Sequence, residues 1–414
     1  MIFLTIGGVV QPGNRIPAFR RTLWKTYNVI AVFACLSFCP MEIIPLAFTT
    51  NLKRFIKNMN MAMQHVSASI KLFVWLKKRD KLMKIVEALG EKMEKYENYE
   101  TFRPMEIVTD EMGRKKIIDC VWAVSGFFVG TLALIESFLT LFVNHEKYER
   151  YYIKDGFKNI TVFEYTQPLP YISVVPWNYK SSHILFACTI IYQWYPLVIF
   201  AFIIIGFDSM FTSIANYSSA QLKVLQGAFK TIRPRSLQKL GLRDVPVMHD
   251  SPVLAKEMDR QINNCIDHLQ TIFWTIEELE SIFSILTLIQ VLISLIIFCT
   301  SLFLVTEVPL ASGKFVVELN YMLAITWQIY QYCYFGNKVT LMGHELPFAV
   351  YDGDWYSSDK NFKKKMLISM QRMMKPVHFT IGKFTTLTLT TFVSIARGSY
   401  SFFTLLKNKD QHDQ

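Results

Sequence analysis

The sequence predicts an all-α membrane protein with seven transmembrane helices. Hydrophobic residues make up 51% of the 414 residues and aromatic residues 14%. Charged residues account for only 19%, against about 25% in ordinary globular chains, and long stretches carry almost none. This composition excludes a disordered chain, a collagen-like chain and a disulfide scaffold, and it disfavours a soluble enzyme.

Seven apolar stretches reach about 20 residues, the length that a helix needs to cross a bilayer. They cover residues 27–48, 58–76, 117–143, 183–213, 280–306, 315–337 and 379–406. The stretch 58–76 is the most polar of the first six, because it contains Gln64, His65 and Lys71. The last stretch is rich in Thr and Ser, which suits a helix that faces water.

The distribution of positive charge predicts the orientation of these helices. With the N-terminus in the cytoplasm, 31 of the 44 Lys and Arg residues fall on the cytoplasmic side, as the positive-inside rule requires. Seven spans then place the C-terminus outside the cell. The sequon Asn159-Ile160-Thr161 lies in the long 144–182 loop, which this orientation makes extracellular, so Asn159 is the predicted N-glycosylation site.

No enzyme, cofactor or metal site is expected. The seven cysteines form no C-x-x-C pair, and phosphate-binding, serine-hydrolase and zinc-protease motifs do not occur. The net charge of +11 is explained by the positive-inside bias, so no nucleic-acid partner is predicted.

Two other membrane classes compete with a channel at this level. A G-protein-coupled receptor also has seven helices, and Glu149-Arg150-Tyr151 resembles one of its motifs. That tripeptide falls in a loop predicted to be extracellular, the orientation is inverted, and span 7 has no Asn-Pro-x-x-Tyr. A transporter, the third class, more often shows internal repeats or paired broken helices.

The most distinctive residues lie in the last third of the chain. They include Tyr332-Cys333-Tyr334-Phe335-Gly336-Asn337, Ala349-Val350-Tyr351, Trp355, Met370, Arg372, Lys375-Pro376 and Ser399-Tyr400-Ser401-Phe402-Phe403-Thr404-Leu405-Leu406. In this order they resemble the insect odorant receptor family, and specifically a ligand-tuned subunit. Length, span number and inverted topology extend the resemblance over the whole chain.

The resemblance implies an odorant-gated, non-selective cation channel in the plasma membrane of olfactory dendrites. Such a subunit assembles with the odorant co-receptor as a tetramer around one pore. It binds a small volatile odorant, and its outer surface contacts membrane lipid. The implied regions of the first half are a cytoplasmic N-terminus (1–26) and transmembrane helices one to four (27–213). A cytoplasmic loop and helical anchor (214–279) follow, and then transmembrane helices five and six with a second part of the cytoplasmic anchor (280–378). The chain ends with a pore-lining helix (379–406) and an extracellular tail (407–414).

Spacing within the last span indicates a pore-lining face. Small or polar residues recur every three or four positions and end in a leucine, as expected for one face of an α-helix. The candidate pore-lining residues are Thr391, Ser394, Gly398, Ser401 and Leu405. Hydroxyls can replace part of an ion's water shell, and a leucine ring can close a pore by dewetting. Close helix packing is the alternative explanation of such a stripe, and Arg397 borders it.

A ligand pocket is predicted in the outer half of the helix bundle. Aromatic side chains with a few polar groups suit a small, mostly apolar ligand. The candidate ligand-binding residues are Gln64, His65, Ser69, Phe138, Phe186, Ile190, Tyr321, Met322 and Ile325. Each could also belong to the packed core. Glu136 and Glu318 are ionisable groups at or near membrane depth and are further candidates.

Overall fold

The computed structural model describes most of the chain. The described residues are 17–49, 52–90, 96–143, 148–155, 158–165, 173–179, 183–243, 251–310, 312–375 and 377–413. Within them, seven long helices account for the seven predicted spans. These helices are α2 (Ala18–Ile43), α3 (Leu52–Gly90), α4 (Pro104–Val143), α5 (His183–Lys230), α7 (Pro252–Thr306), α8 (Gly313–Tyr351) and α10 (Leu389–Asp413).

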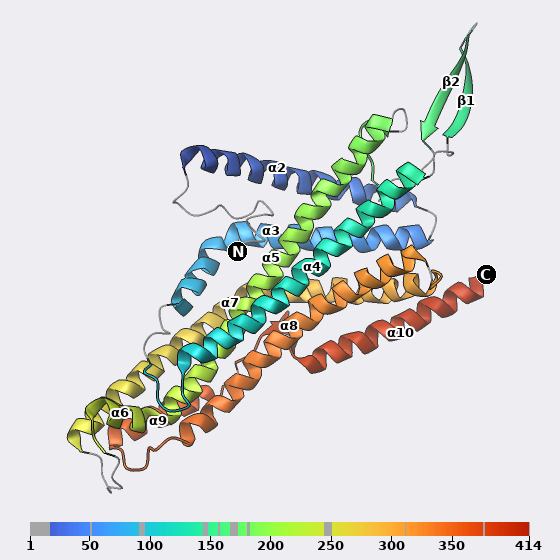
Figure 1. Cartoon of the computed structure of the whole chain (residues 1–414). Helices are drawn as coiled ribbons and strands as arrows, with labels where there is room; N and C mark the ends of the chain where they lie inside the picture. Colours follow the sequence, from blue (N-terminus) through green and yellow to red (C-terminus); the bar gives the residue numbers. More distant parts are fainter. Residues whose placement is uncertain are drawn as a thin grey trace.

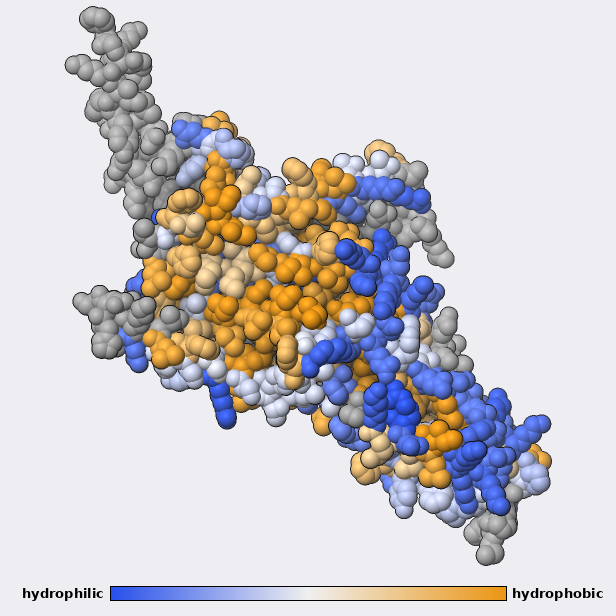
Figure 2. Space-filling view, turned by 180° about the vertical axis from the view of Figure 1, so that it is seen from behind, coloured by the Kyte–Doolittle hydropathy of each residue, from blue (hydrophilic) through white to orange (hydrophobic). Residues whose placement is uncertain are grey.

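The helices form an elongated bundle (Figure 1). Helix α5 packs against α4 and α8, and α3 packs against α7. The C-terminal end of α10 and the hairpin of strands β1 (Tyr148–Asp155) and β2 (Lys158–Tyr165) lie towards one end of the bundle. The short helices α6 (Ile232–Leu240) and α9 (Lys360–Met373) lie at the other. Figure 2 shows a broad hydrophobic belt over the middle of one face, with hydrophilic residues gathered towards the α6/α9 end. An exposed belt of this kind is what a lipid-embedded surface requires.

Several helices run well beyond the predicted spans. The predicted span 280–306 and the last part of the expected cytoplasmic loop and anchor, 214–279, form the single 55-residue helix α7. At 1.5 Å per residue its length is about 80 Å. The helix begins where the Ser251 hydroxyl accepts a hydrogen bond from the Leu254 N–H, with Pro252 in the first turn. The apolar periodicity is therefore continuous from the membrane into the α6/α9 end.

The expected cytoplasmic loop and helical anchor, 214–279, also contains the short helix α6. Pro234 lies in the first turn of α6, where its missing N–H leaves no helical hydrogen bond unmade. Gly241 ends the helix with a φ of 65°, the left-handed conformation typical of a C-cap. Pro234 therefore marks the start of a helix.

The long 144–182 loop contains a hairpin that the sequence reading did not predict. Strands β1 (Tyr148–Asp155) and β2 (Lys158–Tyr165) pair antiparallel. The Glu149-Arg150-Tyr151 tripeptide lies in β1, so it does not end a transmembrane helix. Asn159 lies in β2, and its side chain is outside the described part of the structure.

The last helix begins later and ends later than predicted. Residues 380–386 form strands β3 (Thr380–Ile381) and β4 (Thr385–Thr386) instead of the first turns of a span. Between them Gly382 has a φ of 59°, and a Cβ there would lie 2.6 Å from a Leu288 side-chain carbon, so both conformation and space favour glycine. Helix α10 then continues to Asp413, so residues 407–413 of the expected extracellular tail are helical.

Hydropathy alone identifies fewer spans than the long helices suggest. In the described chain, three segments are long and apolar enough by themselves: Phe19–Phe48, Ile184–Lys230 and Pro252–Thr306. Helices α3, α8 and α10 are long, but their membrane-spanning parts contain more polar residues. In α3, for example, Asn60, Gln64 and Lys71 are buried within the bundle, so polar groups lower the mean hydropathy without facing lipid.

Candidate ligand cavity and pore-facing helix

A cavity of about 130 Å³ lies between α3, α4, α5 and α8. Its wall is mostly aromatic and aliphatic, with a few polar groups, as in small-molecule sites generally. The lining residues are Met61, Gln64, His65, Trp122, Ala123, Gly126, Phe127, Thr131, Trp194, Leu197, Val198, Phe200, Ala201, Phe202, Ile204, Ile205, Tyr321, Ala324, Ile325 and Gln328. The cavity is therefore assembled from four helices that are far apart in sequence.

Four of the nine candidate ligand-binding residues line this cavity. They are Gln64, His65, Tyr321 and Ile325. The first pair lies on adjacent positions of α3 and the second pair one helical turn apart on α8. The structure thus brings the α3 and α8 candidates to one place.

The remaining candidates are not part of the cavity lining. Ser69 contacts the Cys39 Sγ at 3.5 Å, towards α2. Phe186 and Ile190 are buried on α5, but at least one turn before Trp194, the first α5 residue of the lining. Met322 is half-buried outside the lining, and the side chain of Phe138 is outside the described part of the structure. The cavity therefore lies deeper along α5 than expected.

Most polar side chains in the wall already have hydrogen-bond partners. The His65 Nδ1 lies 2.6 Å from a Glu42 carboxylate oxygen, and the imidazole stacks on Phe200 with ring centroids 4.5 Å apart. The Tyr321 hydroxyl donates to the Asn60 carbonyl over 3.2 Å. The Thr131 hydroxyl donates to a carbonyl of its own helix. These contacts fix the shape of the wall.

Gln328 joins the cavity to a buried group of hydrogen-bonded side chains centred on Asp208, which we call the Asp208 network. Its members are Ser67 and Lys71 on α3, Asp208 on α5, Gln290 and Ser294 on α7, and Gln328 and Tyr332 on α8. Asp208 receives hydrogen bonds from Lys71 at 2.6 Å, Tyr332 at 2.7 Å and Gln328 at 2.6 Å. The partners of this carboxylate come from two helices, Lys71 from α3 and the other two from α8.

The Asp208 network continues from the cavity towards α10. The Gln290 amide donates to the Gln328 carbonyl oxygen over 3.1 Å and to the Ser294 hydroxyl over 3.0 Å. Beside Ser294, the Leu295 carbonyl accepts a hydrogen bond of 3.5 Å from Ser399 on α10. Hydrogen bonds, together with the peptide bond between Ser294 and Leu295, therefore connect the cavity wall with the last helix.

The candidate pore-lining stripe lies on the outward side of α10. Ser394 and Ser401 are exposed, Leu405 is 64% exposed, and Thr391 and Gly398 are half-buried. The buried side of the helix carries Ser399 and Phe403, the latter packed in a cluster with Cys299 and Phe303 of α7. The three exposed residues of the stripe thus do not serve close packing within this chain.

Two further side chains of α10 are exposed. Phe402, in the motif that ends at Leu406, is 54% exposed. Arg397, which borders the candidate stripe, is exposed as well. Of the two carboxylates singled out from sequence, Glu318 lies 3.6 Å from Lys57; the Glu136 side chain is outside the described part of the structure.

The Tyr332–Asn337 segment has a packing role that its sequence did not explain. Tyr332 bonds Asp208, as described above. A Cβ at Gly336 would lie 2.6 Å from the Leu387 carbonyl oxygen, so only glycine lets α8 approach the segment that leads into α10. This segment therefore positions α10 against the core.

Sequence reasoning missed the α4 and α5 parts of the wall. Trp122 and Trp194 are ordinary aromatic residues within apolar stretches, and no periodicity separates a cavity-lining Trp from a core Trp. A weak signal was Gly126, where a Cβ would lie 2.5 Å from an Ile205 side-chain carbon. That close approach of α4 to α5 shapes the cavity.

Taken together, a bundle of seven long helices, an apolar belt and an apolar cavity between four helices define a multi-pass membrane receptor. The profile of the 7tm Odorant receptor family matches residues 51–400. The chain belongs to this family, and it is an odorant receptor rather than an enzyme.

Individual relatives agree with the family assignment. The chain is 28% identical over 203 residues to Odorant receptor 10 of Aedes albopictus, a match covering 49% of this chain and 50% of that one. It is 24% identical over 269 residues to Odorant receptor Or1 of Anopheles gambiae, covering 60% and 62%. The matches thus span about half to three-fifths of these relatives.

The fold is also that of a solved insect receptor. The olfactory receptor OR5 from Machilis hrabei superposes with a TM-score of 0.78 at 15% identity, over 98% of this chain and 95% of that one. Its complex with eugenol superposes with a TM-score of 0.79. At this identity the likeness establishes the fold alone.

Proposed function

We propose that this chain is the ligand-tuned subunit of an odorant-gated, non-selective cation channel. The observation that carries the proposal is the outward stripe of α10. Three of its five residues are exposed in the isolated chain, although a stripe of hydroxyls ending in a leucine is a poor surface for lipid. Around a shared axis, four such helices would give permeant cations a path lined by hydroxyls.

Odorant binding is assigned to the cavity between α3, α4, α5 and α8. Its volume of about 130 Å³ is close to that of an engineered cavity of about 150 Å³ that holds benzene. A small volatile molecule bound mainly by apolar contact fits this space. Gln64, His65, Tyr321 and Ile325 are the residues of the predicted set that would contact it.

Gating follows from the connection between this cavity and α10. A ligand that moves the Gln328 side chain changes its hydrogen bond with Gln290, and Gln290 lies on the helix that holds Ser399. The Asp208 network is therefore the proposed physical link from odorant to pore. A ligand shifts the gate only by the difference in its affinity for the closed and open arrangements.

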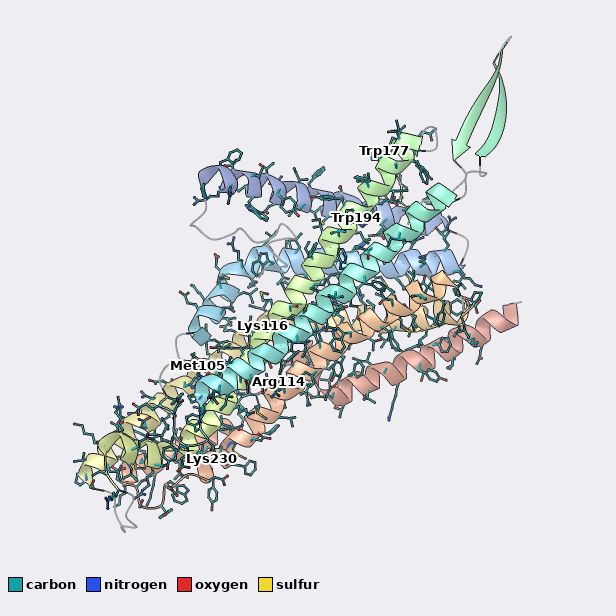
Figure 3. All side chains as sticks on the ribbon, in the orientation of Figure 1. Met105, Arg114, Lys116, Trp177, Trp194 and Lys230 are labelled. Carbon is teal, nitrogen blue, oxygen red and sulfur yellow. The ribbon has the colours of Figure 1, made fainter. Side chains whose placement is uncertain are left out.

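The proposed orientation places the N-terminus in the cytoplasm and the C-terminus outside. Arg114 and Lys116 on α4 and Lys230 on α5 lie towards the α6/α9 end (Figure 3), which the positive-inside rule assigns to the cytoplasm. Trp177 lies near the opposite end, as expected of an interfacial tryptophan. This end contains Asn159, the proposed glycosylation site, and the α6/α9 end forms the proposed cytoplasmic anchor.

The partner and location follow from family membership. The remaining subunits of the tetramer are assigned to the odorant co-receptor, and the assembly to the plasma membrane of olfactory dendrites. A small odorant, permeant cations and membrane lipid complete the set of partners.

Expression with and without the co-receptor tests the proposal. Whole-cell current is recorded during application of a broad panel of volatiles, with surface biotinylation as the expression control. Together, the two chains should give a rapid cation current to some volatiles, and this chain alone should give little. A response that requires GTP and lags by seconds would refute the channel assignment, as would surface-expressed protein without any evoked current.

A further inference from the structure

Gln64 is an unusual member of the cavity wall. The residue is 6% exposed, and in the described structure neither the nitrogen nor the oxygen of its amide has a hydrogen-bond partner. The other polar side chains of the wall that were described above, from His65 to Gln328, are all engaged. Buried polar groups are nearly always paired in folded proteins, so an amide left unpaired at both ends calls for an explanation.

Two further donors in the wall are also unpaired. The indole nitrogens of Trp122 on α4 and Trp194 on α5 are buried without a partner. Together with the Gln64 nitrogen, three donor nitrogens from three helices, with four N–H groups, are unpaired around one cavity. The only acceptor in this unpaired set is the Gln64 oxygen. The set therefore lacks acceptors, and a ligand can supply one.

We propose that this cavity selects small odorants that carry a carbonyl group, such as ketones, aldehydes or esters, and that Gln64 is the residue that recognises it. This inference rests on the proposed odorant-binding role of the cavity and specifies its ligand class. A carbonyl oxygen accepts without needing to donate, which matches the excess of N–H groups. The apolar remainder of the ligand packs against the aromatic wall.

The amide does not need to face the empty cavity for this role. Its two polar atoms are shielded from water in the structure, while the side chain itself lines the cavity. A glutamine side chain has three rotatable bonds, so rotation can bring the N–H to an arriving oxygen. Because the unpaired amide has no hydrogen bond to give up, the new bond is gained without breaking another.

A site that forms a hydrogen bond with its ligand strongly rejects an analogue that lacks the hydrogen-bonding group. An apolar pocket discriminates less strongly between ligands that differ only in shape. The test therefore uses matched pairs in which C=CH₂ replaces C=O, namely acetophenone against α-methylstyrene and 2-heptanone against 2-methyl-1-heptene. The full chain is expressed with the co-receptor, and half-activating concentrations are measured. We expect each active ketone to be at least about tenfold more potent than its alkene, a difference of about 1.4 kcal/mol.

Three variants locate the effect. Gln64→Leu should reduce the potency difference between ketone and alkene to less than about threefold, mainly by lowering the potency of the ketone. Trp122→Phe should reduce this potency difference partially. Ser69→Ala is the matched control, because Ser69 is on the same helix, lies outside the lining and already donates to the His65 carbonyl. Its potency difference should equal that of the wild type.

A stability measurement separates recognition from a structural role. Replacing an unpaired buried amide by an apolar group of similar size costs little, so Gln64→Leu should retain the melting temperature of the ligand-free chain in detergent. A loss of several degrees would show that the amide supports the fold and would overturn the proposal.

The remaining outcomes are also decisive. Equal potency of ketone and alkene in the wild type, or a potency difference that survives Gln64→Leu, overturns the carbonyl proposal. So does a channel that responds to other volatiles of the panel but to no carbonyl compound. Surface-expressed protein with no evoked current to any volatile would instead count against the proposed channel function.

Discussion

Lys71 and Asp208 form an ion pair in the interior of the helix bundle. The Lys71 Nζ lies 2.6 Å from an Asp208 carboxylate oxygen, and the two side chains are 2% and 5% exposed. The residues are separated by 137 positions in the chain. Because isolated charges are costly at membrane depth, this pair explains how a lysine is accommodated in an otherwise apolar span.

Removing one member of the pair should be strongly destabilising. Lys71→Met leaves the Asp208 charge without its cation, and breaking a buried pair this way costs about 3–5 kcal/mol. Lys71→Met together with Asp208→Leu should be more stable than the sum of the two single effects by about 0.5–3 kcal/mol. Melting temperatures in detergent test this double-mutant cycle. Additive effects would show that the two charges do not interact.

Gly336→Ala should disturb the segment before α10. The new Cβ would lie 2.6 Å from the Leu387 carbonyl, and a backbone oxygen cannot move aside without shifting the chain. We expect a lower melting temperature and a reduced odorant-evoked current. Gly113→Ala on α4 is the control: no atom lies within 4 Å of its Cβ position, so it should raise helix stability by about 0.8–1.0 kcal/mol. Equal effects of both changes would contradict the close contact.

Glu111 should make stability depend on pH. Partial burial opposes its charged form, but Lys338 and Lys223 outweigh this and hold the pKa of Glu111 below its usual 4.5. A carboxyl with a lowered pKa contributes stability that is complete above pH 4.5 and is lost as the pH falls through the folded-state pKa. The melting-temperature gap between the wild type and Glu111→Gln should therefore narrow below pH 4.5.

The matched control for Glu111 is Glu106→Gln on the same helix. Glu106 pairs with Arg103 at the surface, where both side chains are more than half exposed, and such pairs contribute little. Its melting temperature should follow that of the wild type at every pH. A gap for Glu111→Gln that stays constant down to pH 3 would show that Lys338 does not stabilise the carboxylate.

Leu405 should act as a gate residue. It is 64% exposed on the outward side of α10, so Leu405→Ser should raise basal current by letting water into the closed pore, whereas Leu405→Val should behave nearly normally. The buried Phe403 provides the comparison: Phe403→Ser should lower surface expression through lost packing. Because the co-receptor subunits supply the other side chains of the gate, the rise in basal current should be largest when the co-receptor residue that corresponds to Leu405 is changed as well. An unchanged basal current in that combination would place the pore on another face.

The two ends of the chain should lie on opposite sides of the membrane. A C-terminal tag should be labelled on intact cells, and an N-terminal tag only after permeabilisation. Asn159→Gln should remove the N-glycan. Ser218→Ala should not, because the second sequon begins at Asn216, which is 1% exposed and donates to the Glu111 carbonyl. Labelling of the N-terminal tag on intact cells would reverse the topology.

Local patterns in the sequence determined the helical class of this protein, its seven long helices and its family. The apolar stretches, the charge bias and the stripe from Thr391 to Leu405 are patterns among residues that lie close together in the sequence. Such patterns can be recognised without knowing how the helices pack. These local patterns placed the start of the last helix too early, before Gly382. There the backbone conformation of Gly382 and its contact with Leu288 outweigh the helix propensity of the neighbouring residues.

Only the tertiary structure decided which side chains share a site. The cavity joins four helices, so its depth on α5 and the contributions of Trp122 and Trp194 depend on how those helices pack. Lys71 gave no indication of its partner, because the position of Asp208 results from long-range packing rather than from spacing. The outward direction of the α10 stripe was settled in the same way, by the burial of Ser399 and Phe403 against α7.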